Sequence, residues 1–207
     1  MEAVLSSFTT EIVGLWIILV WFGIETYWDL WRSVMLPIWL VLPPVALGIL
    51  AQALYGNWIL AAAMTAAIFL HLSNQIIIRA IGTALLLGAS LLAGNTVLAI
   101  GFVLYWILWE THIMGGADAL AVYAALLIAP NANMFWALLA GIFLWALAAM
   151  VIVYRGQLVS RVRQMVWRVM LRDLPKESEI EAEGKPTLGG LFLGVAFYML
   201  WTGLALR

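Results

Sequence analysis

The segment Met114-Gly115-Gly116-Ala117-Asp118-Ala119 places a carboxylate at the start of an apolar run that continues to Pro130. Three small residues stand directly before Asp118, and a second carboxylate, Asp29, ends another apolar run far upstream. An ionisable residue in such a position is costly to hold in apolar surroundings and therefore indicates a functional site. We expect the rest of the chain to form the scaffold that brings the two aspartates together.

The composition predicts an integral membrane protein. Of the 207 residues, 66% are hydrophobic and 10% are charged, whereas soluble domains average about 25% charged residues. The net charge of −1 gives no reason to expect a nucleic-acid partner. Without cysteine and with two histidines, the chain lacks thiol nucleophiles, disulfides and the ligands of cysteine or all-histidine metal sites. We therefore expect neither a metal nor a cofactor.

The apolar runs predict an all-α fold, a polytopic transmembrane bundle of about eight spans. Turn-forming Gly, Asn, Ser and Pro residues separate the runs, as at Gly56-Asn57 and Pro130-Asn131. The expected spans lie near residues 10–28, 35–55, 57–72, 76–93, 95–110, 117–130, 134–154 and 188–206. Residues 1–207 then form a single membrane-embedded domain with one sizeable polar loop, 155–187.

The basic residues predict the orientation of this bundle. With the N-terminus outside, nine of the ten Lys and Arg residues face the cytoplasm and only Arg207 faces outside, as the positive-inside rule requires. Most of them lie in the cytoplasmic loop 155–187 between the seventh and eighth spans. Within this loop, residues 158–172 have one apolar and one arginine-rich helical face, which is typical of an amphipathic helix on the inner membrane surface.

The same topology predicts that both aspartates lie at the cytoplasmic face. Asp29 ends the first span and Asp118 begins the sixth, so an even number of spans separates them. Two carboxylates held close together share a proton. The ionised one can then activate water while the other polarises a scissile carbonyl. The small residues Gly115, Gly116 and Ala117 would let a neighbouring helix or an extended substrate approach closely. This pattern favours an aspartic endopeptidase over a pair of hydrated helix-end residues.

Two motifs resemble those of a known family. Gly115-Gly116-Ala117-Asp118 is similar to the Gly-x-Gly-Asp signature of type IV prepilin peptidases and archaeal preflagellin peptidases. Trp28-Asp29-Leu30, followed by Leu36-Pro37, resembles the family's other aspartate motif. Lys185-Pro186-Thr187 resembles the proline-containing entry to its last span. The chain is closest to the short form of the family, which lacks the cysteine-bearing N-terminal region, so N-methyltransferase activity is not implied.

The resemblance implies that Asp29 and Asp118 are catalytic and that no cofactor takes part. It also implies a location in a prokaryotic cytoplasmic membrane, with the active site facing the cytoplasm. The expected partners are membrane lipid and a precursor protein with a short basic leader and a hydrophobic helix, such as a prepilin or an archaellin. Leu120 stands where the family commonly has lysine. An inactive family member that acts in pilus-type assembly is therefore one alternative, and a proton-coupled transporter using the same carboxylates is another.

Three further residues are possible modulators of the predicted site. Glu25 precedes Asp29 by four residues on the same helical face and would influence its ionisation if buried, although a hydrated interfacial carboxylate is the expected state. Glu110 and His112 lie close before the Gly-Gly-Ala-Asp motif. His112, like His71, is expected to be a hydrogen-bonded residue at a helix end and not a catalytic base.

Cysteine labelling tests the predicted topology in a chain that has no cysteine of its own. Single cysteines at Ser33 and Ser178 should react with a membrane-impermeant maleimide from the cytoplasmic side, and one at Asn133 from the outside. The cysteine-free chain provides the background signal. Labelling of Asn133 and Ser178 from the same side would refute the parity argument for a shared site.

Overall fold

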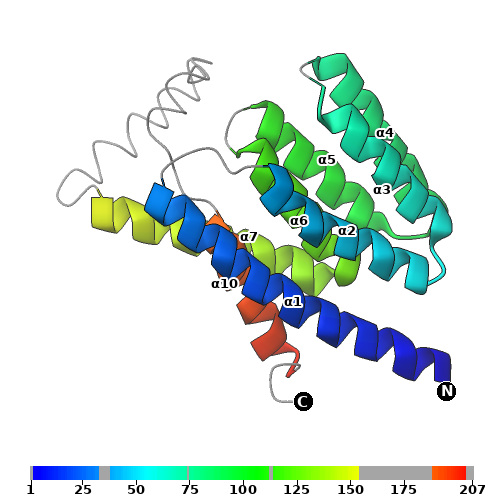
Figure 1. The fold of residues 1–207 in the computed structure, drawn as a ribbon, viewed down its shortest axis with the longest axis horizontal. Coiled ribbons are helices and arrows are strands. Elements are labelled where there is room, and N and C mark those ends of the chain that lie inside the picture. Colours follow the sequence, from blue (N-terminus) through cyan, green and yellow to red (C-terminus); the bar gives the residue numbers. More distant parts are fainter. Residues whose placement is uncertain (1, 33–37, 74, 112–113, 154–187, 204–207) are drawn as a thin grey trace.

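The computed structural model describes residues 2–32, 38–73, 75–111, 114–153 and 188–203. These residues form eight α-helices and no strand, which confirms the predicted all-α fold (Figure 1). The helices are α1 (Glu2–Arg32), α2 (Ile38–Leu54), α3 (Trp58–His71), α4 (Ile76–Leu92), α5 (Thr96–Glu110), α6 (Gly116–Ile128), α7 (Ala132–Val153) and α10 (Leu188–Trp201). The loop 155–187, with its predicted amphipathic helix, lies outside the described residues.

The helices end where the sequence contains turn-forming residues. Gly56 and Gly94 adopt φ angles of 83° and 70° in the turns after α2 and α4, a region that glycine enters without steric cost. The helix α1 begins at Glu2, earlier than the predicted start near residue 10. Among the described helices, only α1, over Thr9–Trp28, is both long and apolar enough to cross a membrane by itself; the others are shorter apolar helices.

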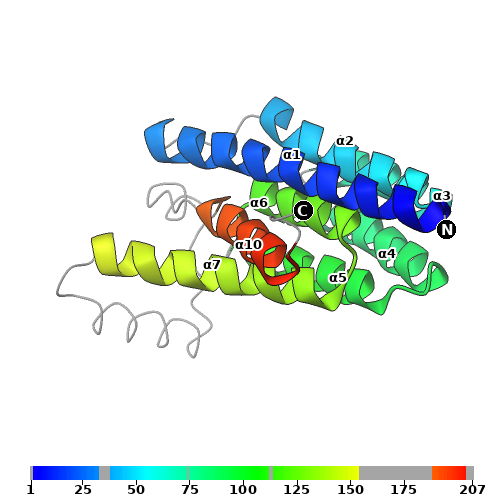
Figure 2. The ribbon, with the colours of Figure 1, turned by 90° about the horizontal axis from the view of Figure 1, so that it is seen from below.

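The helix α6 lies at the centre of the bundle. Figure 2 shows it between α1 and α7, and it also packs against α2, α5 and α10. Every residue from Asp118 to Ile128 is buried. A helix that is apolar on all sides is expected to be enclosed by other helices, so α6 reaches neither solvent nor any surrounding lipid along most of its length.

Neighbouring helices satisfy the backbone at the C-terminal end of α6. The last carbonyls of a helix have no donor within it, and burying them without a partner is costly. Side-chain donors at the C-terminal end of α2 reach two such carbonyls: Gln52 Nε2 to Leu127 O and Tyr55 OH to Ile128 O at 3.0 Å. Just beyond the helix, Asn95 Nδ2 donates to Pro130 O at 2.9 Å. These bonds fix the position of α6 along its own axis.

A second polar cluster at this end joins α1 to α10. The Tyr198 hydroxyl donates to Glu11 Oε1 at 2.7 Å, and Asn131 Nδ2 donates to the same hydroxyl oxygen at 2.7 Å. Glu11 is therefore a structural residue, far along α1 from Asp29.

Glycines allow α7 and α10 to approach to backbone contact. A Cβ atom added to Gly141 would lie 2.3 Å from Gly190 O and 2.4 Å from the amide nitrogen of Gly194. The atoms that it would meet belong to the backbone and cannot rotate away. Small residues at this spacing are typical of tightly packed helix pairs.

We therefore predict that Gly141→Ala lowers the free energy of unfolding by about 1–3 kcal/mol, since the two helices must move apart. Gly88→Ala is the matched control, because a Cβ atom there has no neighbour within 4 Å and alanine favours a helix. Thermal unfolding of the purified protein in detergent measures both effects. Equal midpoints for the two variants would contradict the backbone contact.

Candidate active site

Asp118 lies in the first turn of α6, where the helix favours a negative charge. Its Oδ2 accepts a hydrogen bond from the Gly115 backbone N–H at 3.2 Å, which forms half of a capping box because glycine has no side chain to complete the other half. The helix dipole adds further stabilisation of the ionised form. The residue is 9% exposed, so Asp118 is a carboxylate held in place at the edge of the protein interior.

Glu25 faces Asp118 from α1. The two carboxyl groups lie close enough to interact electrostatically, and Glu25 is fully buried, with an exposed fraction of 0%. Among the described residues, neither oxygen of Glu25 has a hydrogen-bond partner. The interpretation of Glu25 as a hydrated interfacial carboxylate is therefore wrong, because α1 turns this face inward against α6.

Asp29 follows Glu25 by one helical turn within α1. Residues four apart share a helical face, so the α1 turn that carries Asp29 adjoins the turn that faces Asp118. The side chain of Asp29 lies outside what the structure describes, as does the whole of His112. The pairing of Asp29 with Asp118 stays a prediction.

The two glycines of the motif make room for groups of the protein itself. A Cβ atom on Gly116 would lie 2.8 Å from the Trp109 ring, and one on Gly115 would lie 3.0 Å from Asp118 Oδ2. The sequence had suggested that these residues admit a neighbouring helix or a substrate; the described neighbours are an indole of α5 and the Asp118 carboxylate. Ala117 is half-buried and packs against the hydrophobic core.

Trp109 stacks on His71 of α3. The ring centroids are 5.4 Å apart and the planes are inclined by 20°. Both imidazole nitrogens have partners: Nδ1 lies 2.7 Å from Ala67 O and Nε2 lies 3.2 Å from Thr83 Oγ1. This arrangement is that of a hydrogen-bonded structural histidine, as predicted for His71. A Cβ atom on Gly82 would lie 2.9 Å from the imidazole, so the two stacked rings have a glycine on either side.

Glu110, predicted as a possible modulator, forms an ion pair with Arg79 of α4. Arg79 Nε and Nη2 donate to the two Glu110 oxygens at 2.6 and 2.7 Å, and Trp106 Nε1 donates to Oε1 at 3.1 Å. Such bidentate geometry is strong and directional. The guanidinium carbon also lies 5.3 Å from the Trp109 ring centroid. Glu110 is thus a support for the Trp109 stack.

Sequence reasoning missed Trp109 and Arg79 as neighbours of the motif. The available signal was the short connection between Glu110 and Gly116, which makes the chain fold back on itself. The Met114 N–H donates to Leu108 O at 3.0 Å and closes this turn. This turn brings the Trp109 indole, near the end of α5, against Gly116, the first residue of α6.

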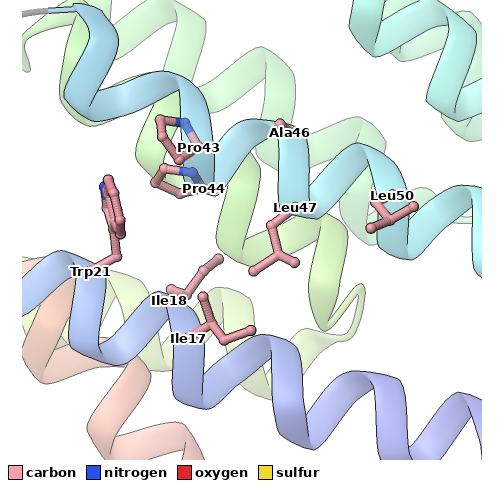
Figure 3. Close-up of a pocket in the computed structure, with 8 residues that line it drawn as sticks. All are labelled: Ile17, Ile18, Trp21, Pro43, Pro44, Ala46, Leu47 and Leu50. Atoms are coloured by element: carbon pink, nitrogen blue, oxygen red, sulfur yellow. The ribbon is translucent and has the colours of Figure 1, made fainter.

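An apolar groove of about 370 Å³ lies between α1 and α2, one turn from Glu25 (Figure 3). Pro43 and Pro44 line it from within α2, and Trp21 lines it from α1. Because Pro44 has no N–H, it leaves the Leu40 carbonyl without its helical donor, and Trp21 Nε1 donates to that carbonyl at 2.7 Å. The lining side chains offer the groove no ionisable group.

A double-mutant cycle tests the contact between Trp109 and Gly116. Gly116→Ala alone should destabilise the protein by about 1–3 kcal/mol, since the new methyl group overlaps the indole. In a Trp109→Leu background the same change should cost less, with a coupling energy of about 0.5–3 kcal/mol. Chemical unfolding of the four proteins measures this coupling. Strictly additive effects would show that the two residues do not touch.

Comparison with known proteins adds no relative to this description. The sequence matches no protein-family model, no curated protein and no solved structure. The resemblance to prepilin and preflagellin peptidases therefore rests on the motif residues, and function has to be argued from the geometry around Asp118.

Proposed function

We propose that this chain is a membrane aspartic endopeptidase that cleaves leader peptides from prepilin-like or archaellin-like precursors at the cytoplasmic membrane face. One observation carries the proposal. The helix that begins with Gly116-Ala117-Asp118 is buried in the bundle, and its carboxylate is faced by the α1 turn that immediately precedes Asp29. Ionisable groups gathered in an otherwise apolar interior are typical of functional sites.

The exterior of the helices supports a membrane location. Large apolar side chains are exposed on the outer faces of the bundle, and such surfaces are rare on soluble monomers. Examples from several helices are Val20 at 61%, Phe69 at 72%, Leu92 at 78%, Phe143 at 68% and Trp201 at 85% exposure. A short, fully enclosed helix such as α6 is compatible with a bilayer because protein, not lipid, surrounds its backbone. We therefore place the bundle in the membrane as about eight spans.

In the proposed mechanism the two aspartates divide the acid and base roles. Asp118, kept ionised by the α6 N-terminus, takes a proton from a water molecule as the water oxygen attacks the scissile carbonyl carbon. Asp29, which holds the shared proton, donates it to the carbonyl oxygen. Asp118 then returns its proton to the leaving amine as the C–N bond breaks. Asp29 takes a proton back from a hydroxyl of the intermediate as the product carbonyl forms, so both carboxyl groups end the cycle as they began it.

A proton-coupled transporter fits the interior less well. A relay needs ionisable groups that continue through the bundle. Beyond Asp118, the described α6 residues are apolar except for Tyr123, whose hydroxyl donates to Phe102 O at 3.0 Å. An inactive family member would share this geometry, so only an activity assay separates it from a peptidase.

The assay is cleavage of a prepilin-like precursor by the purified protein in detergent or liposomes. Asp29→Asn and Asp118→Asn should each abolish cleavage without unfolding the protein, because asparagine keeps the shape of the side chain. The double mutant should be no worse than either single one, since residues of one catalytic unit are strongly non-additive.

Glu11→Gln is the matched control, because glutamine keeps the oxygen that accepts from Tyr198 at the opposite end of α1. It should cleave at the wild-type rate. An Asp118→Asn protein that still cuts as fast as wild type would end the aspartic-dyad proposal, and a wild-type protein that cuts no precursor would favour the inactive alternative.

A further inference from the structure

We infer that Glu25 is a third carboxyl group of this site, that it holds a proton, and that it donates its O–H to Asp118, directly or through one water molecule. It is thus a positioning residue that acts through Asp118. Its effect on cleavage rests on the proposed peptidase function, whereas its protonation does not.

Burial is the first argument. Both carboxyl oxygens of Glu25 are inaccessible to solvent and lack a hydrogen-bond donor among the described residues. A carboxylate in such a place would be neither hydrated nor paired, which is far more costly than a neutral carboxyl group. The adjacent Trp21 indole offsets only a small part of this cost, because its N–H donates to Leu40 O at 2.7 Å. A bound proton removes the charge and turns Glu25 into a donor.

The helices that pack against α1 supply no compensating cation in their described residues. The helix α2 contains no ionisable side chain, and α10 contains only Tyr198, which is hydrogen-bonded to Glu11 at the other end of α1. The helix α6 brings Asp118 and Tyr123, and the Tyr123 hydroxyl donates to Phe102 O. On α1 itself the next ionisable residues are Tyr27, Asp29 and Arg32. Among the described side chains, the charge that faces Glu25 is therefore that of Asp118.

The environments of Glu25 and Asp118 determine which of the two carboxyl groups holds the proton. Asp118 has the Gly115 N–H and the α6 N-terminus to stabilise a negative charge, and Glu25 has neither. When two neighbouring acids differ in this way, the better-solvated one ionises and the other stays neutral. Asp118 is thus the acceptor and Glu25 the donor. Their hydrogen bond would hold the Asp118 carboxylate in orientation, together with the bond that it accepts from the Gly115 N–H.

Infrared spectroscopy of the purified protein tests the protonation without any substrate. At neutral pH an Asp29→Asn protein, which lacks the proton shared by the proposed dyad, should show the C=O stretching band of a protonated carboxyl group, and Asp29→Asn/Glu25→Gln should lack it. Asp118→Asn should shift the band, because the acceptor changes. Glu11→Gln should leave it in place. An Asp29→Asn spectrum without the band, or a band that survives in Asp29→Asn/Glu25→Gln, would overturn the inference.

Cleavage assays distinguish a positioning role of Glu25 from a role in packing alone. Glu25→Gln keeps a donor N–H and should retain most of the cleavage activity. Glu25→Leu packs well but cannot donate, and should lower kcat by about a hundredfold, as expected for a misplaced catalytic group. Equal activities of the Gln and Leu variants would refute the donor role.

The pH profile provides a further signature. Ionisation of Glu25 would put a second negative charge beside Asp118, so wild-type activity should fall as pH rises through that ionisation. Because a free glutamate in the unfolded chain ionises at lower pH, thermal stability should fall over the pH range between the two ionisations and level off above it. Both losses should disappear in Glu25→Gln. A Glu25→Gln protein whose activity and stability depend on pH as in the wild type would argue against the inference. If the wild type cleaves no precursor, the proposed peptidase function fails. The infrared result alone then tests the protonation of Glu25.

Discussion

The burial of α6 is the constraint on which the rest of the structure depends. A helix enclosed along most of its length cannot give its buried terminal backbone groups to solvent, so other parts of the chain have to bond them. At the C-terminal end, Gln52 and Tyr55 from α2 donate to the Leu127 and Ile128 carbonyls. At the N-terminal end, the Asp118 carboxylate accepts from the Gly115 N–H. The candidate catalytic group is thus also part of the bonding that holds the central helix in place.

These two roles of Asp118 explain why the residues around the Gly-Gly-Ala-Asp motif are so closely packed. Gly116 meets the Trp109 indole, which in turn stacks on His71 and lies near the guanidinium of Arg79. Arg79 is anchored by its two bonds to Glu110. In a closely packed interior, displacement of one residue displaces its neighbours. The ion pair and the stacked rings therefore fix the start of α6, which is the preorganisation that the proposed peptidase site would need.

The local environment of each acidic group determines where negative charge is placed at the site. A cluster of acidic groups in an apolar interior can persist only if most of them are neutral or bonded to donors. The α6 N-terminus offers donors at one position, which suits an ionised Asp118, and Glu25 occupies a position with none among the described residues. Different environments thereby give two neighbouring carboxyl groups different roles in our proposal. The same asymmetry would bias a dyad of Asp29 and Asp118 toward an ionised Asp118.

The sequence by itself determined the helices, because apolar runs and turn residues such as Gly56 and Gly94 act locally. It also singled out Asp118, whose glycines and flanking run are adjacent in the chain. Only the tertiary structure decided that Glu25 is buried, that Gly116 accommodates Trp109 and that Gln52 caps α6. The rotation of α1 about its axis decides whether Glu25 meets solvent or Asp118. That rotation is set by packing against α2, α6 and α10. The middle of α1, residues 12–24, is apolar on every side and therefore carries no periodic pattern from which to read the rotation.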